Sequence, residues 1–235
     1  MVFVPIHDTN KLKYIGFQRV TVGLILANIA VFLWQLSLDA KQAVAVAVIA
    51  GVTPASLMGG APLPPEFALL PPEVTLFTYM FLHASWMHLI GNMIFLWVFG
   101  DNIEDALGHL RYLFFYFICG AAAGYTHALM ESGSQAPMIG ASGATAGVIG
   151  AYLVLYPRVK VWVLLLMRIP VRLPAYWILA FWVGFQFYFM LSSSDPTTAW
   201  WAHIGGFVTG IILVMLLKRR EIPLWGPKLD ENSLP

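Results

Sequence analysis

The sequence predicts an all-α integral membrane protein, and three observations lead to this fold class. Of the 235 residues, 59% are hydrophobic and 11% are charged, whereas soluble domains carry about 25% charged residues. A chain of this composition cannot cover a water-facing surface. Its apolar residues gather in six runs of helical length, and lysine and arginine collect on one side of these runs. We therefore expect a six-transmembrane-helix bundle.

The composition also limits the partners of the protein. The net charge is +1, and the basic residues do not form one surface that could bind nucleic acid. The single cysteine, Cys119, lies within an apolar span, so it is expected to be a small buried side chain and not a redox centre. No zinc-protease pattern such as HExxH is present. We expect no nucleic acid, no metal and no cofactor.

The first part of the chain contains one span and a long loop. Residues 1–19 are polar and basic and are predicted to form a cytoplasmic N-terminal segment. Val20–Leu36 is the first span, and it is retained because no small-residue cleavage site follows it. The outer loop 37–85 contains an apolar run, Ala43–Val52, that is too short to cross a membrane. It also contains the segment Pro62–Pro72, whose prolines exclude a continuous helix. We expect this loop to lie in or on the membrane interface.

The remaining spans follow with short connections. They are predicted at residues 86–100, 112–130, 142–156, 174–191 and 199–217. A polar turn, Asp101–Arg111, separates the second span from the third. A basic loop, Arg158–Arg172, encloses the short apolar run Val161–Met167. A turn is expected at Ser192–Thr198, and the sixth span stops at the basic residues that begin the polar tail 218–235.

The distribution of lysine and arginine gives the orientation. With six spans, only Lys41 lies on the outer side. The other twelve lie on the N-terminal side: Lys11, Lys13, Arg19, Arg111, Arg158, Lys160, Arg168, Arg172, Lys218, Arg219, Arg220 and Lys228. Because cytoplasmic loops are enriched in these residues, both termini are expected in the cytoplasm. The prediction is one membrane domain at 20–217, in a bacterial inner membrane, followed by a cytoplasmic tail.

Polar side chains converge at one depth of this bundle. The second, fourth and sixth spans all run inward, and near their outer ends they carry His88 and Asn92, Ser142, and His203. Taken singly, a histidine within a span could be a helix contact, and a serine or asparagine could be a packing residue. Residues that pack independently have no reason to share a depth, and ionisable groups in spans are usually functional. The common level therefore favours one shared site.

These residue types fit nucleophilic catalysis. A serine hydroxyl needs a base within hydrogen-bond reach, and His203 can accept the proton of Ser142 and return it to a leaving amine. The oxyanion that forms needs fixed donors, which Asn92, the His88 ring and the backbone N–H of Ser142 at a helix N-terminus can supply. The outer half-spans carry no acidic residue that could orient His203. We therefore expect a Ser–His dyad.

Small residues on the fourth and sixth spans explain how the dyad could assemble. Gly143 and Gly147 lie on one face of the fourth helix, and Ala202, Gly206 and Gly210 lie on one face of the sixth. Such faces let two helices approach closely. The expected contact would bring the nucleophile and its base within bonding distance.

Three motifs together resemble the rhomboid family of intramembrane serine proteases. They are Gly140-Ala141-Ser142-Gly143, His88-Leu89-Ile90-Gly91-Asn92 and Ala202-His203-Ile204-Gly205-Gly206, in the family's order on the second, fourth and sixth core helices. The resemblance covers about residues 74–217. It implies a Ser142–His203 dyad, an oxyanion hole that uses His88 and Asn92, and structural glycines near the site, with cleavage of transmembrane protein substrates near the outer face of the lipid bilayer. The turn that contains Glu104 resembles the family's structural turn after the second helix.

The sequence also departs from the family pattern. Ala146 stands where family members often carry an aromatic residue that stacks on the catalytic histidine, so Trp200, Trp201 or Phe207 could take that role. Val74-Thr75 replaces the family's Trp-Arg pair in the first loop.

Two segments near the site have only general expectations. His83 is interpreted as a loop residue, bonded to the backbone. The fifth span is rich in aromatic residues and has no evident polar partner, and with the second span it is a candidate wall of the substrate gate.

Other functions stay open from the sequence. The chain could be a catalytically silent rhomboid-like protein that binds client helices in the membrane, although both Ser142 and His203 are present. A small transporter would require internal repeats or charges at mid-membrane depth, and the sequence has neither.

Overall fold

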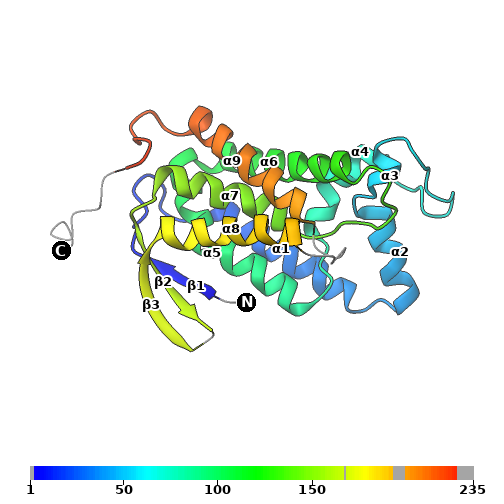
Figure 1. Cartoon of the computed structure of the whole chain (residues 1–235), viewed down its shortest axis with the longest axis horizontal. Helices are drawn as coiled ribbons and strands as arrows, with labels where there is room; N and C mark the ends of the chain where they lie inside the picture. The colour runs from blue at the N-terminus through cyan, green and yellow to red at the C-terminus, as the bar shows by residue number, and fades with distance from the viewer. Residues whose placement is uncertain (1–2, 167, 193–198, 227–235) are drawn as a thin grey trace.

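A computed structural model of the chain describes residues 3–166, 168–192 and 199–226. Its elements are β1 (Phe3–Asp8), α1 (Arg19–Gln35), α2 (Ala40–Ala50), α3 (Pro54–Leu57), α4 (Pro72–Thr78), η1 (Tyr79–Phe81), α5 (Trp86–Leu107), α6 (His109–Met130), α7 (Ser142–Leu155), β2 (Lys160–Leu165), β3 (Ile169–Pro174), α8 (Ala175–Ser192) and α9 (Trp200–Leu217). The short helices α2–α4 lie at one end of the bundle, and the sheet lies toward the other end (Figure 1). Residues 193–198 of the predicted turn and 227–235 of the predicted tail lie outside the described residues.

Helix α7 is the centre of the bundle. Twelve of its 14 residues are buried, and it packs against α5, α6, α8 and α9. Its sequence makes this possible because glycine and alanine dominate its first turns, so neighbouring backbones can approach closely.

The close contact predicted between the fourth and sixth spans is confirmed. A Cβ atom added at Gly206 would lie 1.9 Å from the carbonyl oxygen of Gly143. One at Gly210 would lie 2.0 Å from the carbonyl oxygen of Gly147. Only hydrogen atoms fit at these positions, so α9 lies directly on the backbone of α7.

The prediction of an all-α protein is wrong. Strand β2 pairs antiparallel with both β1 and β3, which gives a three-stranded sheet of order β1-β2-β3. The sheet joins β1, which lies in the segment predicted to be polar, basic and cytoplasmic, to the basic loop 158–172.

Local chemistry explains why this loop is a hairpin. Pro170 and Pro174 cannot sit inside a helix, and both belong to the edge strand β3. On β2, Val161 and Val163 are buried while Trp162 between them is partly exposed. This period of two buries one face of the sheet against the bundle.

Helix α5 is longer than the second predicted span. It continues through the polar stretch at Asp101 and ends at Leu107. Glu104 and Asp105 are buried within it, yet both are paired. The Asp105 carboxylate accepts backbone N–H bonds from residues 13–15, and Glu104 accepts from the first residues of α1. The predicted polar turn is thus the end of a helix, and backbone donors from the N-terminal segment and α1 bond its carboxylates.

The outer loop 37–85 agrees with its prediction in two respects. The short apolar run forms α2, which begins with a capping box between Asp39 and Gln42. The proline-rich stretch is non-helical until Pro72 begins α4. Val52 then pairs with Met138, which joins the end of α2 to the loop before α7.

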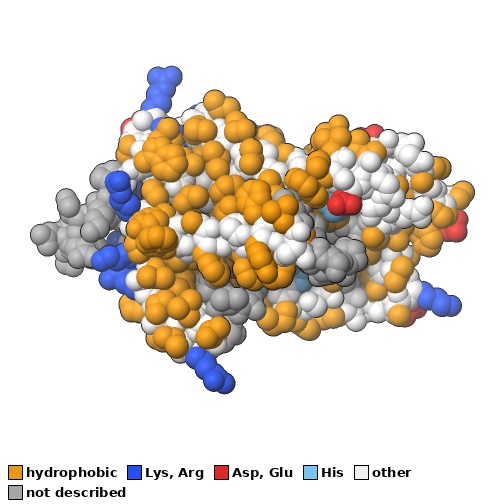
Figure 2. Space-filling model, in the orientation of Figure 1, with side chains coloured by type: hydrophobic (Ala, Val, Ile, Leu, Met, Phe, Trp, Pro, Cys, Tyr) orange, Lys and Arg blue, Asp and Glu red, His pale blue; other side chains and the backbone are white. Residues whose placement is uncertain are grey.

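The helices have the character of an integral membrane protein. Within the described residues, α6 and α9 are long and apolar enough to cross a membrane, and α4–η1 with α5 would form a third span bent by 86°. Helices α1, α7 and part of α8 are apolar but shorter, so the count of six spans stays a prediction. Five predicted spans match α1, α6, α7, α8 and α9 within three residues at each end. Figure 2 shows apolar side chains over most of one face, with lysine and arginine gathered toward the end where the sheet lies in Figure 1.

Candidate active site

Ser142 is the first residue of α7, directly after a tight loop. Gly140 in this loop has a φ of +125°, a conformation that favours glycine. Its N–H donates to the carbonyl oxygen of Tyr79 at 2.9 Å. A Cβ atom at Gly140 would lie 2.6 Å from the ring of His88. The glycine therefore lets the His88 ring rest against the loop that presents Ser142.

The nucleophile and base proposed from the sequence are hydrogen-bonded. Ser142 Oγ lies 2.9 Å from Nε2 of His203 on α9, and both side chains are half-buried. The glycine contact between α7 and α9 holds the two helices at this separation. As the first helical residue, Ser142 also has a backbone N–H with no acceptor in a preceding helical turn.

His203 has a second partner that the sequence reasoning missed. Oε1 of Gln186, on α8, lies 2.8 Å from His203 Nδ1. The sequence showed no acidic residue that could orient His203, and the partner is an amide instead. The view that the fifth span has no polar partner is wrong. Gln186 stands alone as an amide within the predicted span 174–191, and that isolation was the signal available.

Two tryptophan rings flank His203. The ring centroids of Trp182 and Trp200 both lie 6.0 Å from that of His203, and Trp200 is edge-on. Trp200 was among the aromatic residues expected to replace the missing support at Ala146, whereas Trp182 on α8 was not.

Two of the three expected oxyanion donors, His88 and Asn92, lie four residues apart on one face of α5. Asn92 is buried, and its Nδ2 lies 3.1 Å from Nε2 of His83. The His83 ring also packs edge-on against His88, with centroids 5.0 Å apart. His83 is thus a loop residue, as expected, but its ring bonds the side chain of Asn92. Because an amide nitrogen carries two hydrogens, Asn92 keeps one for another acceptor.

One cavity of about 1030 Å³ joins these groups. Its lining includes His88, Asn92, Gly140, Ser142, Gly143, Gln186 and His203. Gly206 is absent from this lining and lies at the helix contact behind it. Within the described part of the chain, no three His, Cys, Asp or Glu side chains are grouped to hold a metal ion.

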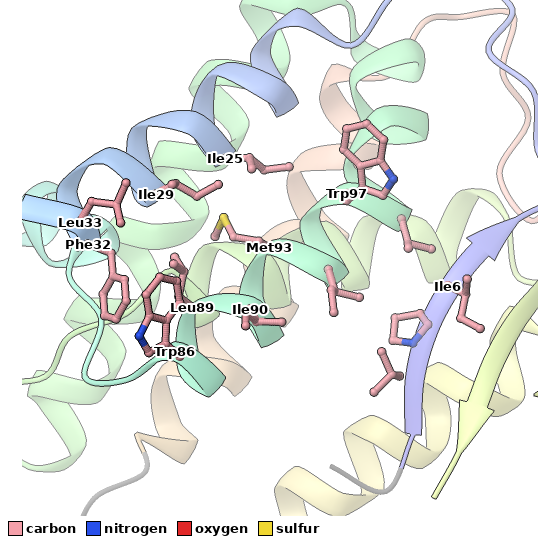
Figure 3. A pocket seen from close by; sticks show the side chains of 14 residues that line it. Ile6, Ile25, Ile29, Phe32, Leu33, Trp86, Leu89, Ile90, Met93 and Trp97 are labelled. Atoms are coloured by element: carbon pink, nitrogen blue, oxygen red, sulfur yellow. The ribbon is translucent and has the colours of Figure 1, made fainter. Parts of the chain in front are cut away.

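A second cavity, of about 540 Å³, lies away from the polar groups. It is formed by α1, α5 and β1 (Figure 3), and its lining side chains are apolar or tryptophan. Trp86, Leu89 and Met93 face it from α5 (Figure 3). With no group that can donate or accept a proton in catalysis, it is not a second active site.

Comparison with known proteins agrees with this arrangement. A family model described as the Rhomboid domain matches residues 72–220, which contain all three motifs. The chain belongs to the rhomboid family.

Several curated relatives share part of their length with this rhomboid. RHOMBOID-like protein 6, mitochondrial, of Arabidopsis thaliana is 31% identical over 153 residues, which cover 64% of this chain and 45% of that protein. Rhomboid protein 1, mitochondrial, of Saccharomyces cerevisiae is 29% identical over 60% of this chain and 40% of its own. Rhomboid-like protease 3 of Toxoplasma gondii is 28% identical over 63% of this chain and 54% of its own. The chain thus spans about half the length of these relatives. They give no support to the expected bacterial membrane.

Proposed function

We propose that this rhomboid is an intramembrane serine endopeptidase that cleaves transmembrane segments of single-pass proteins near the outer face of the membrane. The observation that carries the proposal is the 2.9 Å contact between Ser142 Oγ and His203 Nε2. Both residues line a polar cavity inside an apolar bundle. One relative, from Toxoplasma gondii, is named a protease. Simple helix packing requires neither a serine–histidine pair nor oxyanion donors around it.

The reaction follows from the groups in place. Ser142 Oγ attacks the carbonyl carbon of the scissile amide while His203 Nε2 takes its proton. The carbonyl oxygen becomes an oxyanion that accepts hydrogen bonds from Asn92, the His88 ring and the backbone N–H of Ser142. The protonated His203 then donates to the leaving amine, which leaves an ester on Ser142. Water, deprotonated by the same histidine, hydrolyses this ester and releases the second product.

Substrate and water reach Ser142 by different routes in this proposal. The cavity supplies water because His88, Asn92, Glu131 and Gln186 line it with polar atoms. A substrate helix approaches sideways, between α5 and α8, and must unwind locally, since a helical amide is already hydrogen-bonded. If the predicted six spans and cytoplasmic termini hold, the site lies near the membrane face opposite the cation-rich loops.

Purified protein with a labelled single-pass substrate tests the proposal. Wild type should cleave the substrate and react with a fluorophosphonate, and Ser142→Ala and His203→Ala should do neither. Ser37→Ala is a matched control because Ser37 is exposed and its hydroxyl bonds only locally, to the Trp34 carbonyl. Cleavage that persists in Ser142→Ala would show that the assigned nucleophile is wrong. A folded wild type that binds client helices and neither cleaves nor labels would favour the catalytically silent alternative.

A further inference from the structure

The bond between Gln186 and His203 constrains where the histidine carries its proton. Gln186 is 6% exposed, and its Oε1 lies 2.8 Å from Nδ1 of His203. A carbonyl oxygen of an amide only accepts hydrogen bonds. Nδ1 must therefore donate, which leaves the lone pair of Nε2 for the Ser142 hydroxyl.

This tautomer is the one that a general base needs. A neutral imidazole exists in two forms, and the hydrogen bond at one nitrogen decides which form is present. If the proton moved to Nε2, His203 could not accept one from Ser142. The same oxygen also stabilises the imidazolium that forms during attack, because its partial negative charge faces the protonated ring.

Other titratable groups around the cavity do not supply this orientation. They are Tyr79 on η1, His88 on α5, His127 on α6 and Glu131 directly after α6. Among the described residues, the hydrogen bonds of the His203 ring are those to Ser142 and Gln186. Gln186 therefore acts alone at Nδ1, from a third helix.

We propose that Gln186 is a positioning residue that fixes the tautomer and orientation of His203, and that catalysis consequently depends on the placement of α8. The inference rests on the proposed peptidase function. The hydrogen bonds from Ser142 to His203 and from His203 to Gln186 connect α7, α9 and α8. An outward movement of α8 therefore removes the acceptor at Nδ1 of His203. Neighbours of Gln186 on α8, Phe187 and Tyr188, are exposed, so α8 has its outer face toward lipid and its Gln186 face toward the site.

Substitutions of similar shape separate positioning from packing. Gln186→Met keeps the length of the side chain but removes the acceptor, and Gln186→Glu keeps an acceptor and adds charge. Gln186→Met should lower kcat about 10- to 100-fold with KM changed less than about twofold, because a residue that only positions His203 contributes little to substrate binding. Phe187→Met is the matched control on the same helix and should keep wild-type kinetics.

The pH profile supplies a signature that packing would not give. In Gln186→Glu the acid limb of kcat/KM should move to higher pH, because a carboxylate favours the protonated histidine. In Gln186→Met the acid limb should move to lower pH, because the amide oxygen that stabilises the protonated His203 ring is lost. A purely structural role would lower activity in both variants with the acid limb unchanged, and that result would overturn the proposal. If Gln186→Met fails to fold, the shift in Gln186→Glu decides.

A second measurement does not depend on activity. Nitrogen-15 NMR of histidine-labelled protein, with His203→Ala to assign the signal, reports the tautomer directly. Wild type should show His203 protonated at Nδ1 alone, and Gln186→Met should show a mixture. A mixture already present in wild type would overturn the proposal. Absence of Ser142-dependent cleavage together with a fixed tautomer would instead contradict the peptidase function and leave the positioning by Gln186 supported.

Discussion

At the scale of single residues, a site residue could be predicted when its side chain is polar or ionisable and therefore unusual within an apolar span. Ser142, His203 and Asn92 are rare polar groups at matching positions of apolar spans, so helix topology alone placed them together. Gln186 could not be found in this way. Its role depends on which face α8 turns toward the site. The apolar residues of α8 are spread all around the helix, so the sequence contains no periodic pattern that gives this rotation. The contact of Gly140 with His88 likewise depends on a loop conformation that spacing does not encode.

Asn92→Ala should reduce kcat by one to a few orders of magnitude, the range seen when one oxyanion donor is removed. The stability of the protein should change much less than its turnover, because the lost partner, His83, lies in a loop beside the cavity. Thermal unfolding and kcat measured on the same preparation test this expectation.

The control for this variant is Asn28→Ala. Asn28 is also fully buried, but its Nδ2 donates to the Leu24 carbonyl at 2.8 Å, within α1. It should lower stability and keep kcat per folded molecule. Equal losses of kcat in both variants would argue that Asn92 has only a structural role.

At the scale of elements, helices were easier to predict than their ends or the sheet. The long apolar runs fixed α1, α6, α8 and α9, whereas α5 extends beyond its predicted end because partners from another segment bury its carboxylates. The sheet was missed since β1 and β2 lie more than 150 residues apart and each is too short to be recognised alone. Pairing between distant segments is information that a local pattern does not contain.

Gly206→Ala should destabilise the protein by about 1–3 kcal/mol and abolish cleavage. The added methyl group would meet the Gly143 carbonyl oxygen at 1.9 Å, so α7 and α9 must separate and Ser142 must move from His203. Gly184→Ala is the control, because nothing lies within 4 Å of a Cβ atom there. Thermal unfolding in detergent would show a lower Tm for the first variant only, and equal Tm values would contradict the contact.

The sheet adds a pH-dependent contribution to stability through Asp8. Its carboxylate accepts bonds from the Tyr152 hydroxyl at 2.5 Å and the Asn102 amide at 2.9 Å, which ties β1 to α7 and α5. Burial raises the pKa of Asp8 from 3.8 to about 6, although the hydrogen bond from Tyr152 opposes this rise. The folded protein therefore binds a proton more tightly than the unfolded chain. The stabilisation that this proton gives is complete below about pH 4 and is lost as the pH rises through about 6.

Asp8→Asn should remove this dependence. The amide oxygen can accept both hydrogen bonds without charge, so the variant should gain stability relative to wild type on going from pH 4.5 to pH 7.5, by on the order of 3 kcal/mol at most. The difference in Tm between variant and wild type, measured at both pH values, tests it. A difference that is the same at both values would show that the buried carboxylate does not titrate in this range.

At the scale of the whole molecule, the arrangement of charges and the depth of the site describe one orientation. The sheet, the cation-rich loops and the C-terminal ends of helices α7 and α9 lie on one side of the bundle (Figure 1). Helix α7 begins with Ser142 on the opposite side. Composition was sufficient to predict an integral membrane protein, and its orientation stays a prediction from the charges. The number of spans needs a measurement, because several helices are shorter than a bilayer is thick.

Cysteine labelling in sealed right-side-out vesicles measures that topology. Ser37→Cys should react with a membrane-impermeant maleimide from outside, and Glu221→Cys should react only after the vesicles are opened. The native Cys119 is fully buried, so its background should be low. Reaction of both introduced cysteines from the same side would rule out the six-span arrangement.

The contact between α7 and α9 also bears on biosynthesis. Ser142 precedes its base by 61 residues in the chain, and chains are made from the N-terminus. A ribosome that has inserted α7 has therefore produced the nucleophile but neither Gln186 nor His203. In the proposed peptidase, the Ser142–His203 pair forms only when α9 has docked on the glycine face of α7. The proposed activity would therefore begin only when folding of the membrane domain is complete.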